Sequence, residues 1–172
     1  TRQQTGRTVG LSGSWLRSWW FYLASSLFFF SIAYWGWKPL PLTFSHSTQI
    51  AMLIVGTLLY FPGMLFLLWA RLTLGKNYFV STGFGAQLFK GHQLITSGPY
   101  AIVRHPMYFG VIVLFFSIPV ALGSLCGLIP SGALTLLILI RTALEDKTLR
   151  EELEGYNSYT EKVRYKIIPG IW

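Results

Sequence analysis

The sequence has 172 residues, enough for one domain. Hydrophobic residues make up 52% of it and charged residues 12%, whereas a soluble domain carries about 25% charged residues, so an ordinary soluble enzyme is excluded. The net charge of +8 does not indicate nucleic-acid binding, because the cations flank apolar runs and form no basic patch with stacking aromatic residues. We therefore expect an integral membrane protein that binds no nucleic acid.

Two long apolar runs in the first half of the chain predict membrane-spanning helices. Ser18–Trp37 is an uncharged run of 20 residues with aromatic residues at both ends, and Ile50–Ala70 is a second run of 21 residues. About 20 apolar residues cross a bilayer as a helix, and aromatic residues favour its two interfaces. Pro62-Gly63, inside the second run, is expected to kink that helix and free a backbone carbonyl.

Two shorter apolar runs follow a long polar segment, residues 71–106, which contains no acid. Tyr108–Leu122 and Leu125–Ile140 have 15 and 16 residues and are joined by Gly123-Ser124. Both runs are short for a full crossing. They could be tilted spans that flanking residues extend, or they could form a hairpin that does not fully cross the membrane. A tight helical hairpin is the arrangement we favour, with each arm bent by a proline.

The distribution of Lys and Arg predicts the orientation in the membrane. With four crossings, residues 1–17, 71–106 and the tail (141–172) lie on one side and carry three, four and six cations, while the other side carries only Lys38. The positive-inside rule then places both termini and the long loop in the cytoplasm. The expected fold is an all-α, polytopic integral membrane helical bundle with four core transmembrane helices.

The tail contains all six acidic residues of the chain. Arg141, Glu145, Leu149 and Leu153 recur every four residues and Tyr156 follows three later, which predicts one stripe of a C-terminal helix. Most other charges fall on other faces, so Arg141 and Glu145 continue the buried stripe. Charged residues facing a bundle interior are functional candidates. The alternative is an i,i+4 ion pair worth a few tenths of a kcal/mol.

The segment 92–108 combines polar chemistry with a stiff backbone. It contains two His, one Arg and two Tyr next to Gly-Pro and His-Pro pairs. The prolines fix the backbone, as a close-fitting ligand site requires; interfacial anchoring by Tyr and His is the alternative. A metal is not expected, because His92 and His105 are 13 residues apart with no Cys or acid nearby. No phosphate loop or nucleophile elbow is present.

These segments together resemble a known family. The pattern His-x-Leu-Ile-x-x-Gly-Pro-Tyr-x-x-x-Arg-His-Pro-x-Tyr-x-Gly over residues 92–110, the Arg141–Glu145 pair and the ending Tyr156-x-x-Tyr159…Ile168-Pro169-Gly170 resemble the isoprenylcysteine carboxyl methyltransferases. That family shares its C-terminal core with membrane phospholipid methyltransferases. The match covers residues 90–172. The combined pattern is specific to the family, whereas any one of its motifs alone would be weak evidence.

The resemblance implies an all-helical membrane enzyme that uses S-adenosylmethionine and releases S-adenosylhomocysteine. It implies N-terminal transmembrane helices over 1–70 and a catalytic core over 71–172, within one domain, and family members vary enough at the N-terminus to allow five crossings. Glu145 matches the family's cofactor-binding acid, and Arg141 its substrate-binding arginine. The other cofactor contacts that it implies are His92, Gln93, Leu94, Ile95, Tyr100, His105, Pro106, Met107 and Tyr108. No metal is implied.

The residues are also compatible with this chemistry. Methyl transfer mainly requires that nucleophile, methyl group and leaving sulfur be held in line. A carboxylate is already ionised at pH 7 and needs no base, and Arg141 could hold it as a catalytic and substrate-binding group through a two-pronged contact. Arg164 is a second candidate catalytic cation, with an interfacial arginine as its alternative. An isoprenoid tail would enter from the bilayer, between the second helix and the hairpin.

Three functions remain open. The leading hypothesis is methyl transfer to a lipophilic acceptor, with the carboxylate of a prenylated cysteine as the family's namesake substrate. The second is transfer to an amine such as a phosphatidylethanolamine head group, which needs a base such as Glu145 or a His. The third is of another class: an NADPH-dependent, sterol-reductase-like protein, because such enzymes have a similar Arg-His-Pro-x-Tyr-x-Gly run, or a non-catalytic membrane protein.

Overall fold

The computed structural model describes residues 6–8, 23, 27, 31, 44–75, 87–89 and 93–172. The expected first crossing, Ser18–Trp37, therefore lies outside the described residues apart from three helical positions. The described elements of the protein, in chain order, are β1 (Gly6–Thr8), α2 (His46–Leu74), β2 (Gln87–Phe89), the 3₁₀ helix η3 (Gly98–Ala101), α3 (Pro106–Ala121), α4 (Leu125–Glu152) and α5 (Tyr156–Lys162). The fold of this part of the chain is helical, as expected.

The two short strands are the exception to the all-α prediction. β1 and β2 pair antiparallel, with Gly6 opposite Phe89 and Thr8 opposite Gln87. Backbone outside a helix still needs hydrogen-bond partners, and this pairing supplies them for two segments that are far apart in the sequence. Hydropathy gives no signal for a pairing of three residues per strand.

α2 is the second predicted span, extended at both ends. It begins after Ser45, whose side chain accepts from the Thr48 amide at 3.2 Å, and ends at Gly75, where φ is +50°. An oxygen at this position satisfies one of the amides that an α-helix leaves open. The 29 residues continue through Pro62 without a break in the helix, and at 1.5 Å per residue they span about 44 Å.

α3 and α4 form the predicted helical hairpin. Gly123 turns the chain with φ +63°, and Ser124 caps α4 by accepting from the Gly127 amide at 3.2 Å. α4 is longer than the apolar run from which it was predicted, because its 28 residues continue to Glu152. Hydropathy fell where the charges began, but Leu, Arg, Glu and Lys are good helix formers and extend the helix.

The prediction of one continuous tail helix was wrong. α4 ends at Glu152, and α5 is a separate helix that begins at Tyr156. Gly155 lies between them with φ +80°, a conformation that glycine adopts without steric cost. The chain therefore turns back after α4, and Tyr156 does not extend the stripe of Arg141 and Glu145.

α2 and α3 pack antiparallel through glycines. A Cβ on Gly63 would lie 2.8 Å from Val113 Cγ1, a Cβ on Gly110 would lie 2.9 Å from Leu67 Cβ, and one on Gly56 would collide with Ala121. Small residues allow such close approach between helices in lipid. The contacts leave no room for an isoprenoid chain between α2 and α3 along this seam, so the expected entry between the second helix and the hairpin is closed there.

Two described helices are long and apolar enough to cross a membrane. They are α2 and the part of α4 from Cys126 to Glu152, and only 11% of the most apolar stretch of each is buried. Large side chains face outward, including Leu72 and Ile129 at 75% exposure. Apolar surface of this extent is unusual in water and is compatible with lipid. α3 is apolar but shorter, with 16 residues.

Candidate functional site

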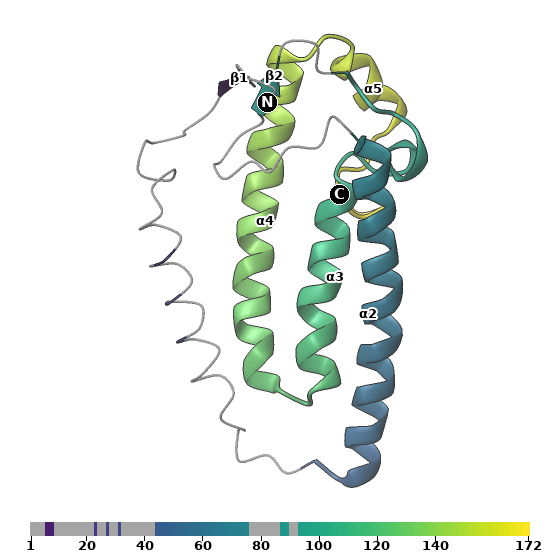
Figure 1. Ribbon diagram of the computed structural model, residues 1–172, viewed down its shortest axis with the longest axis vertical. Helices are drawn as coiled ribbons and strands as arrows, with labels where there is room; N and C mark the ends of the chain where they lie inside the picture. Colours follow the sequence, from purple (N-terminus) through teal and green to yellow (C-terminus); the bar gives the residue numbers. More distant parts are fainter. Residues whose placement is uncertain are drawn as a thin grey trace.

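The polar parts of the fold gather at one end of the helices. In Figure 1 the carboxyl end of α2, the amino end of α3 and the carboxyl end of α4 lie at the same end, together with α5 and the β1–β2 pair. The connection from Gln93 to His105, called the loop from here on, and the last ten residues, called the C-terminal segment, lie there too. This end therefore holds the residues that the sequence singled out.

The loop and the C-terminal segment are joined by backbone hydrogen bonds. The Arg104 amide donates to the Tyr165 carbonyl at 3.0 Å, and the His105 amide donates to the Lys166 carbonyl at 2.7 Å. The Tyr159 hydroxyl of α5 also donates to the Tyr100 carbonyl at 2.6 Å. The loop and the tail are thus in direct contact.

An apolar cluster supports this junction from the side. Tyr156, Tyr159 and Val163 are buried together, and Leu94 of the loop packs against them with Leu149 and Leu153 of α4. Leu94 therefore has a packing role whether or not it also touches a ligand. It fixes the start of the loop on α5, with Gln93 exposed before it and Ile95 half-buried after it.

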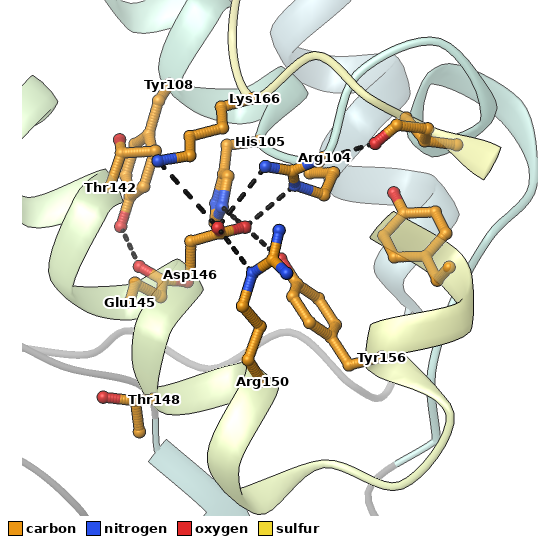
Figure 2. A network of polar contacts seen from close by, with 12 residues as sticks. Arg104, His105, Tyr108, Thr142, Glu145, Asp146, Thr148, Arg150, Tyr156 and Lys166 are labelled. Atoms are coloured by element: carbon orange, nitrogen blue, oxygen red, sulfur yellow. Dashed lines mark hydrogen bonds and ion pairs between the residues drawn. The ribbon is translucent and has the colours of Figure 1, made fainter. Parts of the chain in front are cut away.

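Asp146 binds side chains from three other segments (Figure 2). Its Oδ1 accepts from Arg104 Nε at 2.8 Å and from the Tyr156 hydroxyl at 2.9 Å, and its Oδ2 accepts from Arg104 Nη2 at 3.3 Å. Arg150 Nε and Lys166 Nζ lie 3.3 and 3.9 Å from Oδ2. The Arg104 and Asp146 side chains are 3% and 4% exposed. One carboxylate thus joins the loop, α4, α5 and the C-terminal segment.

Arg104 uses its remaining donors on the backbone. Its Nη1 donates to the carbonyls of Val163 and Arg164 at 2.8 and 2.9 Å, so all three guanidinium nitrogens have partners. A buried charge is tolerated when it is paired and its polar atoms are bonded. Arg104 and Asp146 therefore act mainly as a clamp between the loop and the carboxyl end of the chain.

His105 is buried between this clamp and Tyr108. Its Nε2 lies 3.6 Å from Asp146 Oδ1, too far for a hydrogen bond, and has no hydrogen-bond partner among the described residues. Its ring stacks on Tyr108, with centroids 5.8 Å apart and planes 13° apart. His105 thus helps to hold the Tyr108 ring, and its Nε2 is a buried polar atom that a ligand could satisfy.

The two tyrosines of α5 remain neutral donors. Burial, followed by the charge of Asp146 and the hydrogen bond to it, raises the pKa of the Tyr156 hydroxyl above its ordinary range. Burial also raises the pKa of Tyr159, and it outweighs the opposite effect of Arg104. Both hydroxyls therefore keep the protons with which they bond Asp146 and the Tyr100 carbonyl.

Tyr108 connects the two charged residues that the tail spacing singled out. Its hydroxyl donates to Glu145 Oε2 at 2.6 Å and accepts from Arg141 Nε at 2.8 Å. The Arg141 guanidinium carbon lies 5.9 Å from the centre of the Tyr108 ring. All three side chains are half-buried. The periodicity predicted that Arg141 and Glu145 continue a buried stripe; in the structure they are half-buried, and Tyr108 from the start of α3 lies between them.

The other predicted site residues differ in how deeply they are buried. Tyr100, His105 and Pro106 are buried, Met107 is half-buried, and Pro106 is the first residue of α3. Arg164 is exposed, and its carbonyl accepts a hydrogen bond from Arg104. His92 lies outside the described residues.

Sequence reasoning missed the Arg104–Asp146 pair. Arg104 was counted only as a loop cation and as part of the Arg-His-Pro motif, and Asp146 only as one acid of the tail. A signal existed, because Asp146 follows the candidate Glu145 directly and Arg104 lies between two proline-stiffened turns. Nothing in the spacing relates two residues 42 positions apart.

Comparisons with known proteins show which family this chain belongs to. The family model described as phospholipid methyltransferase matches residues 51–154. The chain belongs to this family. The matched range includes α2, the loop, α3 and α4, and so includes Tyr108, Arg141 and Glu145. No curated protein matches the chain.

A solved structure is also similar to this family member. It is the eukaryotic intramembrane Ras methyltransferase, isoprenylcysteine carboxyl methyltransferase, with a TM-score of 0.56 and 26% sequence identity. The match covers 70% of this chain and 43% of that protein, so this chain spans less than half of its length. Both comparisons point to membrane methyltransferases, in agreement with the family suggested by the motifs.

Proposed function

We propose that this protein transfers a methyl group from S-adenosylmethionine to a lipophilic anion, of the prenylcysteine carboxylate type. The observation that carries this proposal is the Arg141–Tyr108–Glu145 contact, which places a cationic and an anionic side chain side by side at the end of apolar helices. We further propose that residues 71–172 form the catalytic core and that this end faces the cytoplasm, because residues 71–106 and the tail together carry ten of the 14 cations.

The residues at this end fit an S-adenosyl cofactor. Glu145 offers a half-buried carboxylate to ammonium or hydroxyl groups, and His105 Nε2 is a buried polar atom without a hydrogen-bond partner in the described part of the chain. Half-buried Ile95 and Met107 offer apolar contacts. S-adenosylmethionine, when bound, supplies a methyl group on a positively charged sulfur. The chain's own role is to hold the two reactants in line, which can lower the barrier by about 7–11 kcal/mol.

Arg141 is suited to hold the acceptor carboxylate. A guanidinium binds a carboxylate by two parallel, charge-assisted hydrogen bonds, and an ionised carboxylate attacks without a base. Arg141 has exposed apolar neighbours on α4, Ile140 and Leu144, which suit a prenyl chain lying in the bilayer. Because glycines close the α2–α3 seam, we place the acceptor on the α4 side of the hairpin.

An amine acceptor is the second candidate, and the matched family model favours it by name. A phospholipid amine is protonated near neutral pH and must lose its proton before attack. Glu145 is the only described carboxylate that contacts Tyr108 and could serve as that base. The guanidinium of Arg141 beside it would repel an ammonium group, which is why we place the carboxylate first.

Transfer of a labelled methyl group separates these acceptors. The full chain, purified in lipid nanodiscs, is incubated with S-adenosylmethionine labelled in its methyl group and with either N-acetyl-S-farnesylcysteine or phosphatidylethanolamine. We expect label in the prenylcysteine, released as methanol by mild base because it is an ester. Base-stable label in the phospholipid would support the amine instead. Label in neither acceptor would contradict the proposal.

Ligand protection separates a methyltransferase from a reductase. A ligand that binds only the folded protein, at 100 times its dissociation constant, adds about 2.7 kcal/mol of stability. We expect S-adenosylhomocysteine to raise the thermal midpoint and NADPH to leave it unchanged. Stabilisation by NADPH alone would favour the hypothesis of a reductase-like protein. If neither ligand raised the thermal midpoint, a non-catalytic protein would be favoured.

A further inference from the structure

We propose that the Tyr108 hydroxyl couples acceptor binding to cofactor binding, so that each ligand raises the affinity for the other. This inference rests on the function proposed above and adds an energetic coupling between its two substrates. Tyr108 is a positioning residue here, because it acts through Arg141 and Glu145.

The hydrogen bonds around Tyr108 have a fixed direction. A tyrosine hydroxyl has one proton, and a carboxylate can only accept. The Tyr108 hydroxyl oxygen lies 2.6 Å from Glu145 Oε2, so its proton must point to that residue. The hydroxyl oxygen then accepts from Arg141 Nε at 2.8 Å. The order is therefore guanidinium, hydroxyl, carboxylate, and each bond polarises the next.

The Tyr108 ring is held in place independently of these bonds. It stacks on His105, whose backbone is hydrogen-bonded to the C-terminal segment at Lys166. Tyr108 itself is in the first turn of α3, just after Pro106. The hydroxyl is therefore a fixed point between two side chains of α4, and a change at Glu145 reaches Arg141 through it.

The charges give the direction of the coupling. Without ligands, Glu145 draws the positive charge of Arg141 towards Tyr108. A ligand ammonium at Glu145 would compete for that carboxylate and weaken its pull through the hydroxyl. The guanidinium would then be more available to an acceptor carboxylate. Coupling between two binding sites is reciprocal, so the acceptor must also tighten cofactor binding by the same factor.

The experiment measures acceptor affinity with and without the product of the cofactor. The full chain in nanodiscs is titrated with N-acetyl-S-farnesylcysteine, first alone and then with saturating S-adenosylhomocysteine, which has no methyl group to transfer. For the wild type we expect binding to tighten at least about fivefold, the lower end of usual coupling. For Tyr108→Phe we expect a change of less than about twofold, because Phe keeps the ring and loses the bridge.

Two further variants sharpen the test. Tyr165→Phe removes an exposed hydroxyl of the C-terminal segment and should keep the wild-type coupling factor. Glu145→Gln removes the charge that engages Arg141, so it should bind the acceptor more tightly than the wild type when S-adenosylhomocysteine is absent. A site that was merely damaged would not gain affinity.

The possible failures can be told apart. Coupling of equal size in the wild type and in Tyr108→Phe would overturn this inference and leave the proposed function intact. So would a wild type that binds both ligands independently, or a Glu145→Gln variant with unchanged or weaker acceptor binding. A wild type that binds no S-adenosylhomocysteine would contradict the proposed function, and the inference with it.

Discussion

At the scale of single residues, Asp146 joins the segments that meet at the site end of the helices. Its buried carboxylate is contacted by two arginines and a tyrosine, and Arg104 is buried with it. Taking one partner from a buried ion pair leaves the other charge without compensation, which costs more than the pair itself gains. The position of the loop relative to α4 therefore depends on Asp146.

Asp146→Asn tests this role. The amide keeps the shape of the side chain but leaves Arg104 buried without a counter-charge, so we expect the free energy of unfolding to fall by about 3–5 kcal/mol. Urea unfolding in a mild detergent, followed by tryptophan fluorescence, measures this. Glu151→Gln is the control, because its pair with Lys147 is 4.0 Å long and exposed, and should change stability by less than about 1 kcal/mol. Equal effects of the two variants would rule out the clamp.

Arg141→Ala tests the assignment of the acceptor cation. We expect methyl transfer to fall by about two orders of magnitude, since truncating one partner of a buried charge pair costs about 2–5 kcal/mol, while S-adenosylhomocysteine binding largely survives. Both are measured on the same preparation, with Lys162→Ala, an exposed position of α5, as the control. Loss of S-adenosylhomocysteine binding together with methyl transfer would assign Arg141 to the cofactor instead.

At the scale of elements, the α2–α3 seam is the rigid part of the bundle. Gly56, Gly63 and Gly110 bring the two backbones together, and close approach of backbones is a main source of helix association in lipid. α4 meets α3 near the hairpin, where the Ser131 hydroxyl donates to the Phe115 carbonyl at 2.6 Å, and again at Tyr108. The face of α4 near Arg141 is thus better placed than the seam to admit a lipid.

Gly110→Ala tests the seam. The new Cβ would lie 2.9 Å from Leu67 Cβ and 3.1 Å from Leu67 Cα, so one backbone must shift. Overpacking of this kind costs about 1–3 kcal/mol, which we expect as a lower thermal midpoint. Gly132→Ala on α4 is the matched control, because its Cβ meets nothing within 4 Å. If the α2–α3 seam had room for the extra methyl group, the two variants would have the same thermal midpoint, and this result would contradict the prediction.

Helix periodicity predicted the elements better than it predicted their ends. The hairpin was predictable, because Gly123-Ser124 separates two apolar runs and glycine permits the tight turn. The break before α5 was not, because Leu149, Leu153 and Tyr156 fit a continuous helical stripe equally well. Only the positive φ of Gly155 distinguishes the two arrangements, and glycine is common enough within helices that its presence alone did not decide.

At the scale of the whole molecule, the site is assembled from segments that are far apart in the sequence. The motif over 92–110 and the tail pair Arg141–Glu145, which the resemblance to a family singled out, lie in contact at one end of the bundle. The clamp could not be predicted, because Arg104 and Asp146 meet only after the hairpin has brought α4 back beside the loop. The tilt and sidedness of the helices likewise depend on the bilayer and stay sequence-based predictions.

Hydrogen exchange tests the central claim most directly, namely that the loop, α4 and the C-terminal segment enclose one cofactor site. Amide exchange of the full chain in nanodiscs is followed by mass spectrometry with and without S-adenosylhomocysteine. We expect slower exchange in peptides from 93–108 and from 141–167 together, with no change at the hairpin turn around Gly123, which lies at the other end. Protection confined to one of the two segments, or none in either, would contradict a shared site.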